Sequence, residues 1–126
     1  MFNKDLTPYE YLYTGEEFPR PLNVGWLDTV STFDVGETTD DFKMRLFLLC
    51  KTRIEECRGV HECPFCACSD QITETRDGIT LQLGSAEIRA TGVDGTVYAA
   101  PNLIYHYVAK HGYKPPEGFI RAVCHN

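Results

Sequence analysis

The spacing of apolar residues predicts a first helix from about Thr39 to Thr52. The apolar positions that recur at i, i+4, i+7 and i+8 are Phe42, Leu46, Leu49 and Cys50. This is the spacing of a helix face that packs on a core. Thr38 and Asp41, three residues apart, resemble a capping box at the start of the helix. Because Cys50 lies on the apolar face, we expect it to be a buried packing residue.

Short apolar and β-branched runs after residue 78 predict strands. The runs are Ile79–Leu83, Ala86–Ala90 and Thr96–Ala100. Gly84-Ser85 separates the first two and suits a two-residue type II′ turn, and a second turn lies at residues 92–95. The pattern therefore predicts a small three-stranded antiparallel sheet whose strands follow one another as hairpins.

A second helix is predicted from Leu103 to about His111, ended by Gly112. Residues 117–123 are expected to form a short terminal helix or turn. The first 37 residues lack helical periodicity and are rich in proline, glycine and aromatic residues, which indicates an extended arm packed on the core. The expected fold class is α+β, with two main helices, in one domain over residues 1–126.

Composition narrows the classes of function. A chain of 126 residues fits one domain. Its net charge is −6 and its twelve Lys and Arg residues are scattered, which argues against nucleic acid as a partner. An acidic surface is compatible with binding a basic protein, so another protein is the expected partner.

Neither an export signal nor a membrane span is expected. The first 18 residues contain no continuous apolar stretch, and no apolar run approaches the roughly 18 residues needed to cross a bilayer. We therefore expect a cytoplasmic protein without a membrane partner. In that compartment clustered cysteines more often serve metal binding or redox chemistry than disulfides.

The segment "RGVHECPFCACSD" carries the strongest chemical signal in the chain. In Cys63-Pro64-Phe65-Cys66, the C-x-x-C spacing places two sulfur atoms on the same side of a turn, which forms half of a tetrahedral zinc site. Thiolate and imidazole ligands favour Zn²⁺, with iron second. We expect a structural zinc knuckle in which Cys63 and Cys66 are ligands.

His61 and His106 are the predicted completing ligands. His61 lies in the knuckle segment, and His106 lies near the start of the second helix, so the order of knuckle, hairpin and helix is treble-clef-like. His111 and Cys68 are alternative ligands that could replace His61 or His106. At about 100° per residue, His106 and His111 lie about 140° apart, and they cannot face one metal unless the helix end is distorted.

Two other chemistries stay open beside a non-catalytic interaction protein. Cys63 and Cys66 would serve a redox switch, although such a pair usually lies between a strand and a helix. A zinc hydrolase would need an open coordination position, with Glu62 as general base. The sequence contains no established catalytic motif. Glu87 is expected to face outward as a partner of Arg89.

Several segments together resemble an uncharacterised bacterial family of small soluble proteins. They are "YTGEEFPRPLNVGWLD", "RGVHECPFC", "LGSAEIRA" and "VYAAPNLIYHYVAKHGYKPPEGFIRAV". The resemblance covers roughly residues 13–123, through motifs of the form RGxHxCxxC and YxAPxLIxHYVxxHxYxPP, and implies no established activity. It implies that the family pattern includes His61, Cys63, Cys66, His106 and His111, without saying which of them bind a metal. Ala90 departs from the branched aliphatic residue expected there.

Overall fold

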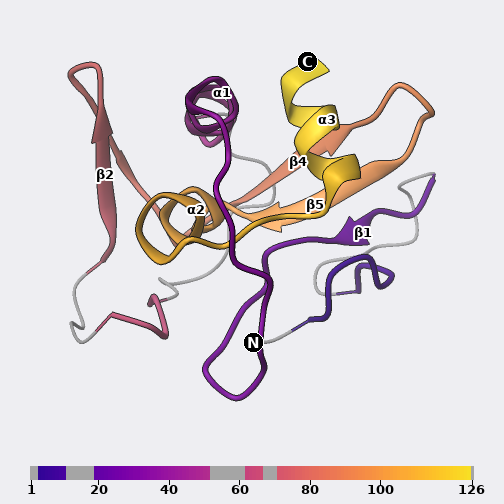
Figure 1. The fold of residues 1–126 in the computed structure, drawn as a ribbon, viewed down its shortest axis with the longest axis horizontal. Coiled ribbons are helices and arrows are strands. Elements are labelled where there is room, and N and C mark those ends of the chain that lie inside the picture. The colour runs from indigo at the N-terminus through magenta and orange to yellow at the C-terminus, as the bar shows by residue number, and fades with distance from the viewer. Residues whose placement is uncertain (1–2, 11–18, 52–61, 67–70, 126) are drawn as a thin grey trace.

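The computed structural model describes residues 3–10, 19–51, 62–66 and 71–125. Its elements, in chain order, are β1 (Leu22–Asn23), α1 (Asp40–Leu49), β2 (Thr73–Arg76), β3 (Ile79–Gln82), β4 (Glu87–Thr91), β5 (Val97–Pro101), α2 (Ile104–His111) and α3 (Glu117–His125). The fold is α+β, as predicted, with three helices and two small sheets in the described residues (Figure 1). Within these residues, no helix has the length and apolar character needed to cross a bilayer.

The strands pair differently from the predicted three-stranded antiparallel sheet. Strands β4 and β5 are antiparallel, but the third strand of their sheet is β1, which runs parallel to β5. Strand β3 pairs with β2 in a separate hairpin that stands at the left of Figure 1. The turn of this hairpin is Asp77-Gly78, with φ values of 51° and 79°. Two successive positive φ angles match the twist of antiparallel strands, so β3 pairs with its preceding neighbour, and Gly84-Ser85 connects two sheets.

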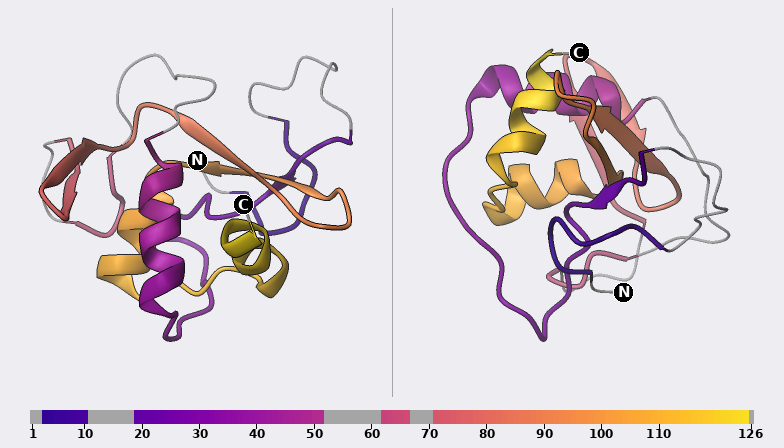
Figure 2. Two further views of the ribbon diagram at one scale, coloured as in Figure 1. Left: turned by 90° about the horizontal axis from the view of Figure 1, so that it is seen from above. Right: turned by 90° about the vertical axis from the view of Figure 1, so that its right-hand side faces the viewer.

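The three-stranded sheet is covered on both faces. Side chains on one face, including Ile88 and Ala100, belong to the main hydrophobic core. On the other face, Ala99 packs in a smaller cluster with Tyr9 and Trp26. Figure 2 shows the three helices gathered on one side of the sheet and the N-terminal segment on the other. Side chains alternate between the faces of a strand, so neighbouring residues of β5 reach both layers.

Glu87 is buried, contrary to the expectation that it faces outward. It does pair with Arg89, whose Nη1 lies 3.0 Å from Glu87 Oε1, but Glu87 itself is 0% exposed. The hydroxyl of Tyr9 donates to the same carboxylate at 2.7 Å, and the Arg89 guanidinium lies 4.7 Å from the centre of the Tyr9 ring. The N-terminal segment therefore covers the face of β4 that carries Glu87, although the alternation of residues in the strand predicts that this face is exposed.

Helix α1 begins one residue later than the predicted capping box. Thr39 is the N-cap, and its Oγ1 accepts a hydrogen bond from the Phe42 backbone N–H at 3.1 Å. The helix ends at Leu49, three residues before the predicted end. Cys50 is 2% exposed, which confirms its predicted burial, and burial raises the pKa of its thiol to about 12.

Candidate metal centre

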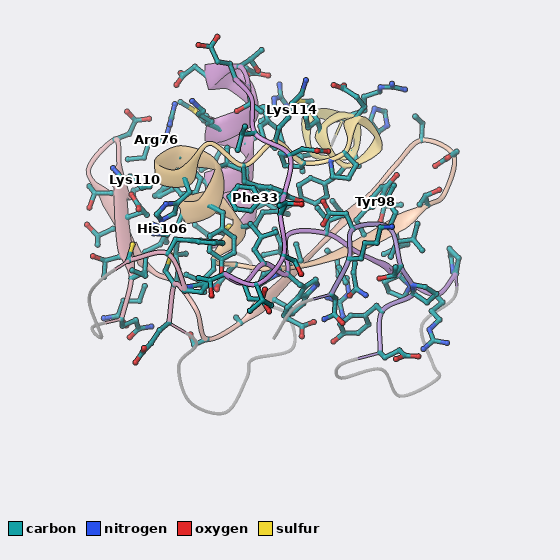
Figure 3. All side chains as sticks on the ribbon, turned by 60° about the horizontal axis from the view of Figure 1, so that its bottom comes forward. Phe33, Arg76, Tyr98, His106, Lys110 and Lys114 are labelled. Atoms are coloured by element: carbon teal, nitrogen blue, oxygen red, sulfur yellow. The ribbon has the colours of Figure 1, made fainter. Side chains whose placement is uncertain are left out.

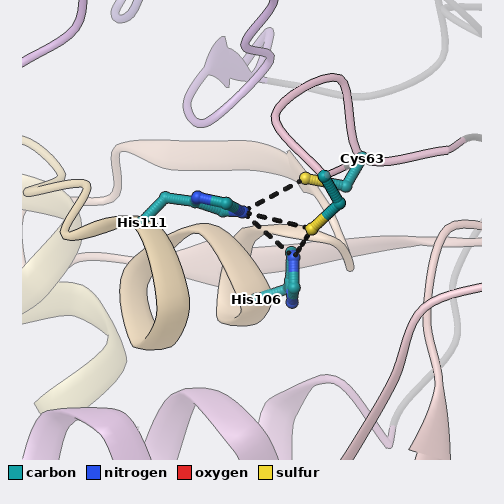
Figure 4. Close-up of side chains that lie close together, drawn as sticks. Cys63, His106 and His111 are labelled. Carbon is teal, nitrogen blue, oxygen red and sulfur yellow. Dashed lines mark hydrogen bonds between the residues drawn. The ribbon is translucent and has the colours of Figure 1, made fainter. Parts of the chain in front are cut away.

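Four side chains from two distant segments meet at one point of the structure. Cys63 and Cys66 come from the C-x-x-C turn, and His106 and His111 come from α2. Their ligand atoms all lie within 4.8 Å of one another. Figure 4 shows the rings of His106 and His111 and the sulfur of Cys63 pointing toward one another above the end of the helix. This Cys₂His₂ cluster could hold a metal ion.

The distances within the cluster fit a small tetrahedral site. Cys66 Sγ lies 3.2 Å from His106 Nε2 and 3.5 Å from His111 Nε2, and Cys63 Sγ lies 3.4 Å from His111 Nε2. The two Nε2 atoms are 3.3 Å apart. A tetrahedron with Zn–S bonds of about 2.3 Å and Zn–N bonds of about 2.0 Å has S···N edges of about 3.5 Å and an N···N edge of about 3.3 Å. These four distances fit a zinc-sized ion, and the other two, from Cys63 Sγ to Cys66 Sγ and to His106 Nε2, are within 4.8 Å.

The C-x-x-C segment forms a tight turn that is also held by an aromatic side chain. The backbone N–H of Cys66 donates to the Cys63 carbonyl at 3.4 Å. Between them, the ring of Phe65 packs against Tyr107 and His111, with centroid distances of 5.8 and 5.3 Å. This cluster of rings supports the turn from the helix side, so a metal would not be the only contact that positions the two sulfur atoms.

Both histidines reach the same point because the end of α2 is widened. Gly112 has a left-handed φ of 69° and its N–H bonds to the Tyr107 carbonyl, five residues back. The Tyr113 N–H bonds to the same carbonyl. A turn closed over five residues rotates less per residue than the usual i→i−4 turn. This reduces the 140° separation expected for His106 and His111, and it supplies the distortion that their convergence requires.

Glu74 on β2 holds the far side of the His106 ring. Its Oε2 lies 2.6 Å from His106 Nδ1, and Lys110 Nζ lies 3.8 Å from its other oxygen. Figure 3 shows His106 and Lys110 on the flank of α2 where the β2–β3 hairpin stands. A carboxylate that accepts from Nδ1–H selects the tautomer whose Nε2 carries a lone pair, and it makes that nitrogen a better metal ligand.

The cluster is half enclosed by protein. Cys63 and His106 are buried, at 3% and 5% exposed, whereas Cys66 and His111 are partly exposed. Burial and the neighbouring His106 lower the pKa of His111, which favours the neutral imidazole that binds metals. Burial raises the pKa of Tyr107, and the nearby thiols of Cys63 and Cys66 act in the same direction.

The structure brings together Cys63, Cys66 and His106, which are three of the four predicted ligands. The fourth member of the cluster is His111, which the sequence offered as an alternative ligand. His61 and Cys68 lie outside the described residues, so their predictions remain untested. His106, a predicted ligand, is buried, because Glu74 and the C-x-x-C turn cover its side of the helix.

The sequence reasoning missed Glu74 entirely. Thr73–Arg76 has no apolar alternation, so it was not predicted as a strand. Asp77-Gly78, a strong hairpin dipeptide, was the available signal for the strand. Nothing in the sequence indicated that Glu74 would meet His106, which lies 32 residues further along the chain.

Comparison with known proteins gives a family without a known activity. No significant match was found among curated proteins or among solved structures. One family model matches residues 1–124, nearly the whole chain, and it is described as a domain of unknown function, DUF7919. The chain therefore belongs to the DUF7919 family.

Proposed function

We propose that this protein binds one Zn²⁺ ion through Cys63, Cys66, His106 and His111, and that the ion is structural. The observation that carries the proposal is a group of four distances from 3.2 to 3.5 Å among these ligand atoms, which match edges of a tetrahedral zinc site, with all four ligand atoms within 4.8 Å of one another. Four protein ligands close the coordination sphere. A closed site contributes to folding and leaves no position for substrate or water.

The donor set favours zinc over other metals. Two sulfur and two nitrogen donors in a tetrahedral arrangement suit Zn²⁺ better than Mg²⁺ or Ca²⁺, which prefer oxygen ligands. The carboxylate of Glu74 behind His106 is an arrangement typical of zinc sites, where it fixes the histidine tautomer.

The ion would join three parts of the fold. It would connect the C-x-x-C turn to α2 and, through His106 and Glu74, to the β2–β3 hairpin. The sequence of knuckle, hairpins and helix makes this a treble-clef-like site. The biological role that fits a closed centre, an acidic chain and the absence of a catalytic motif is that of a cytoplasmic, non-catalytic protein-interaction module.

The test is metal content measured by elemental analysis of protein purified without chelators. We expect about one zinc per chain in the wild type and a loss of zinc in Cys63→Ser. Because Cys63→Ser is expected to destabilise the chain as well as to remove a ligand, cobalt(II) substitution of the wild type gives a second measurement. Intense visible ligand-field bands with sulfur charge transfer would identify tetrahedral coordination that includes thiolates.

The choice of histidines is tested by a matched pair of variants. His111→Ala is expected to lose the tetrahedral cobalt spectrum, and His61→Ala is expected to keep it. The reverse result would replace His111 by His61 in the ligand set. A five-coordinate or water-exchanging cobalt site would favour the hydrolase alternative. Metal-free protein with a reversible Cys63–Cys66 disulfide would replace the zinc proposal with a redox switch.

A further inference from the structure

A pocket of about 260 Å³ lies directly beside the candidate metal centre. Its walls come from four separate parts of the chain. Trp26 and Leu27 contribute from the segment after β1, Pro64 from the C-x-x-C turn, and Ala86 from the connection before β4. Leu103 and Tyr107 contribute from the N-cap and the middle of α2. Most of this lining is apolar, which is the usual character of a binding pocket.

The charge of the pocket has one sign. Among the described residues that line it, the charged ones are Asp28 and Glu62, and neither makes an ion pair with another described residue. One oxygen of Asp28 accepts the Val30 backbone N–H at 3.0 Å, which holds this carboxylate in place. An apolar cavity with two unneutralised carboxylates complements a ligand that has an apolar body and a cationic end.

From this complementarity we propose that the pocket receives an arginine side chain of a partner protein. The inference rests on the proposed role as a protein-interaction module and names the site and the chemistry of the partner. The pocket is smaller than the roughly 300–1,000 Å³ of typical small-molecule sites, so it suits one inserted side chain. Arginine has an apolar stem and a planar cation with five donors, which two carboxylates on separate segments can share.

The metal centre and the pocket share a wall. Glu62 and Pro64 flank Cys63, and Tyr107 follows His106 on α2. A metal that holds Cys63 against His111 therefore also holds Glu62 and Pro64 beside Tyr107. The structure in this way links metal loading to the shape of the pocket, and removal of zinc is expected to weaken arginine binding.

Trp26 provides a local probe because it is the only tryptophan in the chain and it lines the pocket. The experiment titrates zinc-loaded protein with N-acetyl-Leu-Arg-amide and follows tryptophan fluorescence. The matched control ligand is N-acetyl-Leu-citrulline-amide, which keeps the shape of arginine but has no charge. We expect saturable binding of the arginine peptide and binding of the citrulline peptide that is about tenfold weaker, with an affinity difference that shrinks as salt is added.

Two double variants test whether the arginine peptide binds in the pocket. Asp28→Asn with Glu62→Gln is expected to weaken the arginine peptide about tenfold, to the level of the citrulline peptide. The control pair Glu37→Gln with Asp77→Asn removes two negative charges from exposed positions outside the pocket and should bind as the wild type does. The arginine pocket would be overturned if both double variants bound the arginine peptide equally well. It would also be overturned if the wild type bound the arginine and citrulline peptides equally well.

The zinc content of the same samples separates this inference from the proposed function. A zinc-loaded protein that does not respond to the arginine peptide would overturn the pocket and leave the zinc centre standing. Charge-dependent peptide binding to a protein that contains no zinc would support the pocket and overturn the zinc proposal.

Discussion

Glu74 and His106 are joined by a 2.6 Å contact between Oε2 and Nδ1, although they lie on a hairpin and a helix that are distant in the sequence. The opposite nitrogen of the same ring lies 3.2 Å from Cys66 Sγ. One imidazole thus connects a buried carboxylate to the candidate metal centre. The contact acts together with the hydrogen bond of 3.3 Å from Arg76 Nη1 to the Tyr105 hydroxyl to place the β2–β3 hairpin beside α2, and it makes the Glu74 carboxylate part of the zinc proposal.

Replacement of Glu74 should weaken zinc binding without removing a ligand. Glu74→Ala leaves His106 Nδ1–H without its acceptor and should lower zinc affinity by about 10- to 100-fold, the usual effect of losing such a partner. Glu74→Gln keeps an acceptor oxygen and should cost less. Competition against a chromophoric chelator measures both values, with the exposed Glu37→Gln as the control. An affinity unchanged in Glu74→Ala would show that the carboxylate does not support the metal ligand.

Removal of zinc should lower the thermal stability of the chain substantially. The ion would join the C-x-x-C turn to α2, so a chelator should favour the unfolded state. A loss of about 3 kcal/mol corresponds to a fall in Tm of roughly 10 °C for a domain of this size. Scanning calorimetry with and without chelator measures the change, and added zinc should restore the original Tm. A Tm that is insensitive to chelator would contradict a structural role for the metal.

The helices could be predicted from the sequence because their signals are local. The end of α2 follows from Gly112, which adopts the left-handed conformation that glycine favours. The apolar spacing of α1 was equally informative, and Phe42 and Leu46 are indeed fully buried. The C-x-x-C pair was recognised for the same reason, since both sulfur atoms come from one short turn.

The rest depends on contacts between distant segments. Strand β1 joins the sheet through parallel pairing of Leu22 with Tyr98, which no local pattern reveals. Helix periodicity alone places His106 off the apolar side of its helix, and its burial follows only when the hairpin carrying Glu74 is placed against it. His111 reaches the cluster from a helix end that is closed by a bond over five residues at Gly112, a feature that ideal helix geometry does not include.

The position of the α1 cap gives a prediction with a built-in control. Thr39→Ala removes the side-chain oxygen that accepts the Phe42 N–H and should lower the free energy of unfolding by about 1 kcal/mol. Thr38→Ala, one residue earlier, should change it by less than about 0.5 kcal/mol. Urea denaturation of the two variants measures the difference. A larger effect at Thr38 would restore the capping box that the sequence suggested.

The buried pair of Glu87 and Arg89 should be among the most sensitive positions outside the metal centre. Glu87→Gln leaves the Arg89 guanidinium, only 11% exposed, without its carboxylate, and breaking a buried pair in this way costs on the order of 3 kcal/mol. Tyr9→Phe removes one hydrogen bond to the same carboxylate and should cost less, about 1–3 kcal/mol. Both free energies come from urea denaturation monitored by circular dichroism.

The exposed Glu37→Gln serves as the control for Glu87→Gln, because it makes the same chemical change at the surface and should alter stability by less than about 0.5 kcal/mol. Tyr9 comes from the N-terminal segment and Glu87 from β4, so their contact fixes that segment over the sheet. Amide hydrogen exchange should therefore increase around Asn23 and Trp26 in Tyr9→Phe, since both lie beneath the same segment. Wild-type stability in Glu87→Gln would contradict a stabilising role for the ion pair between Glu87 and Arg89.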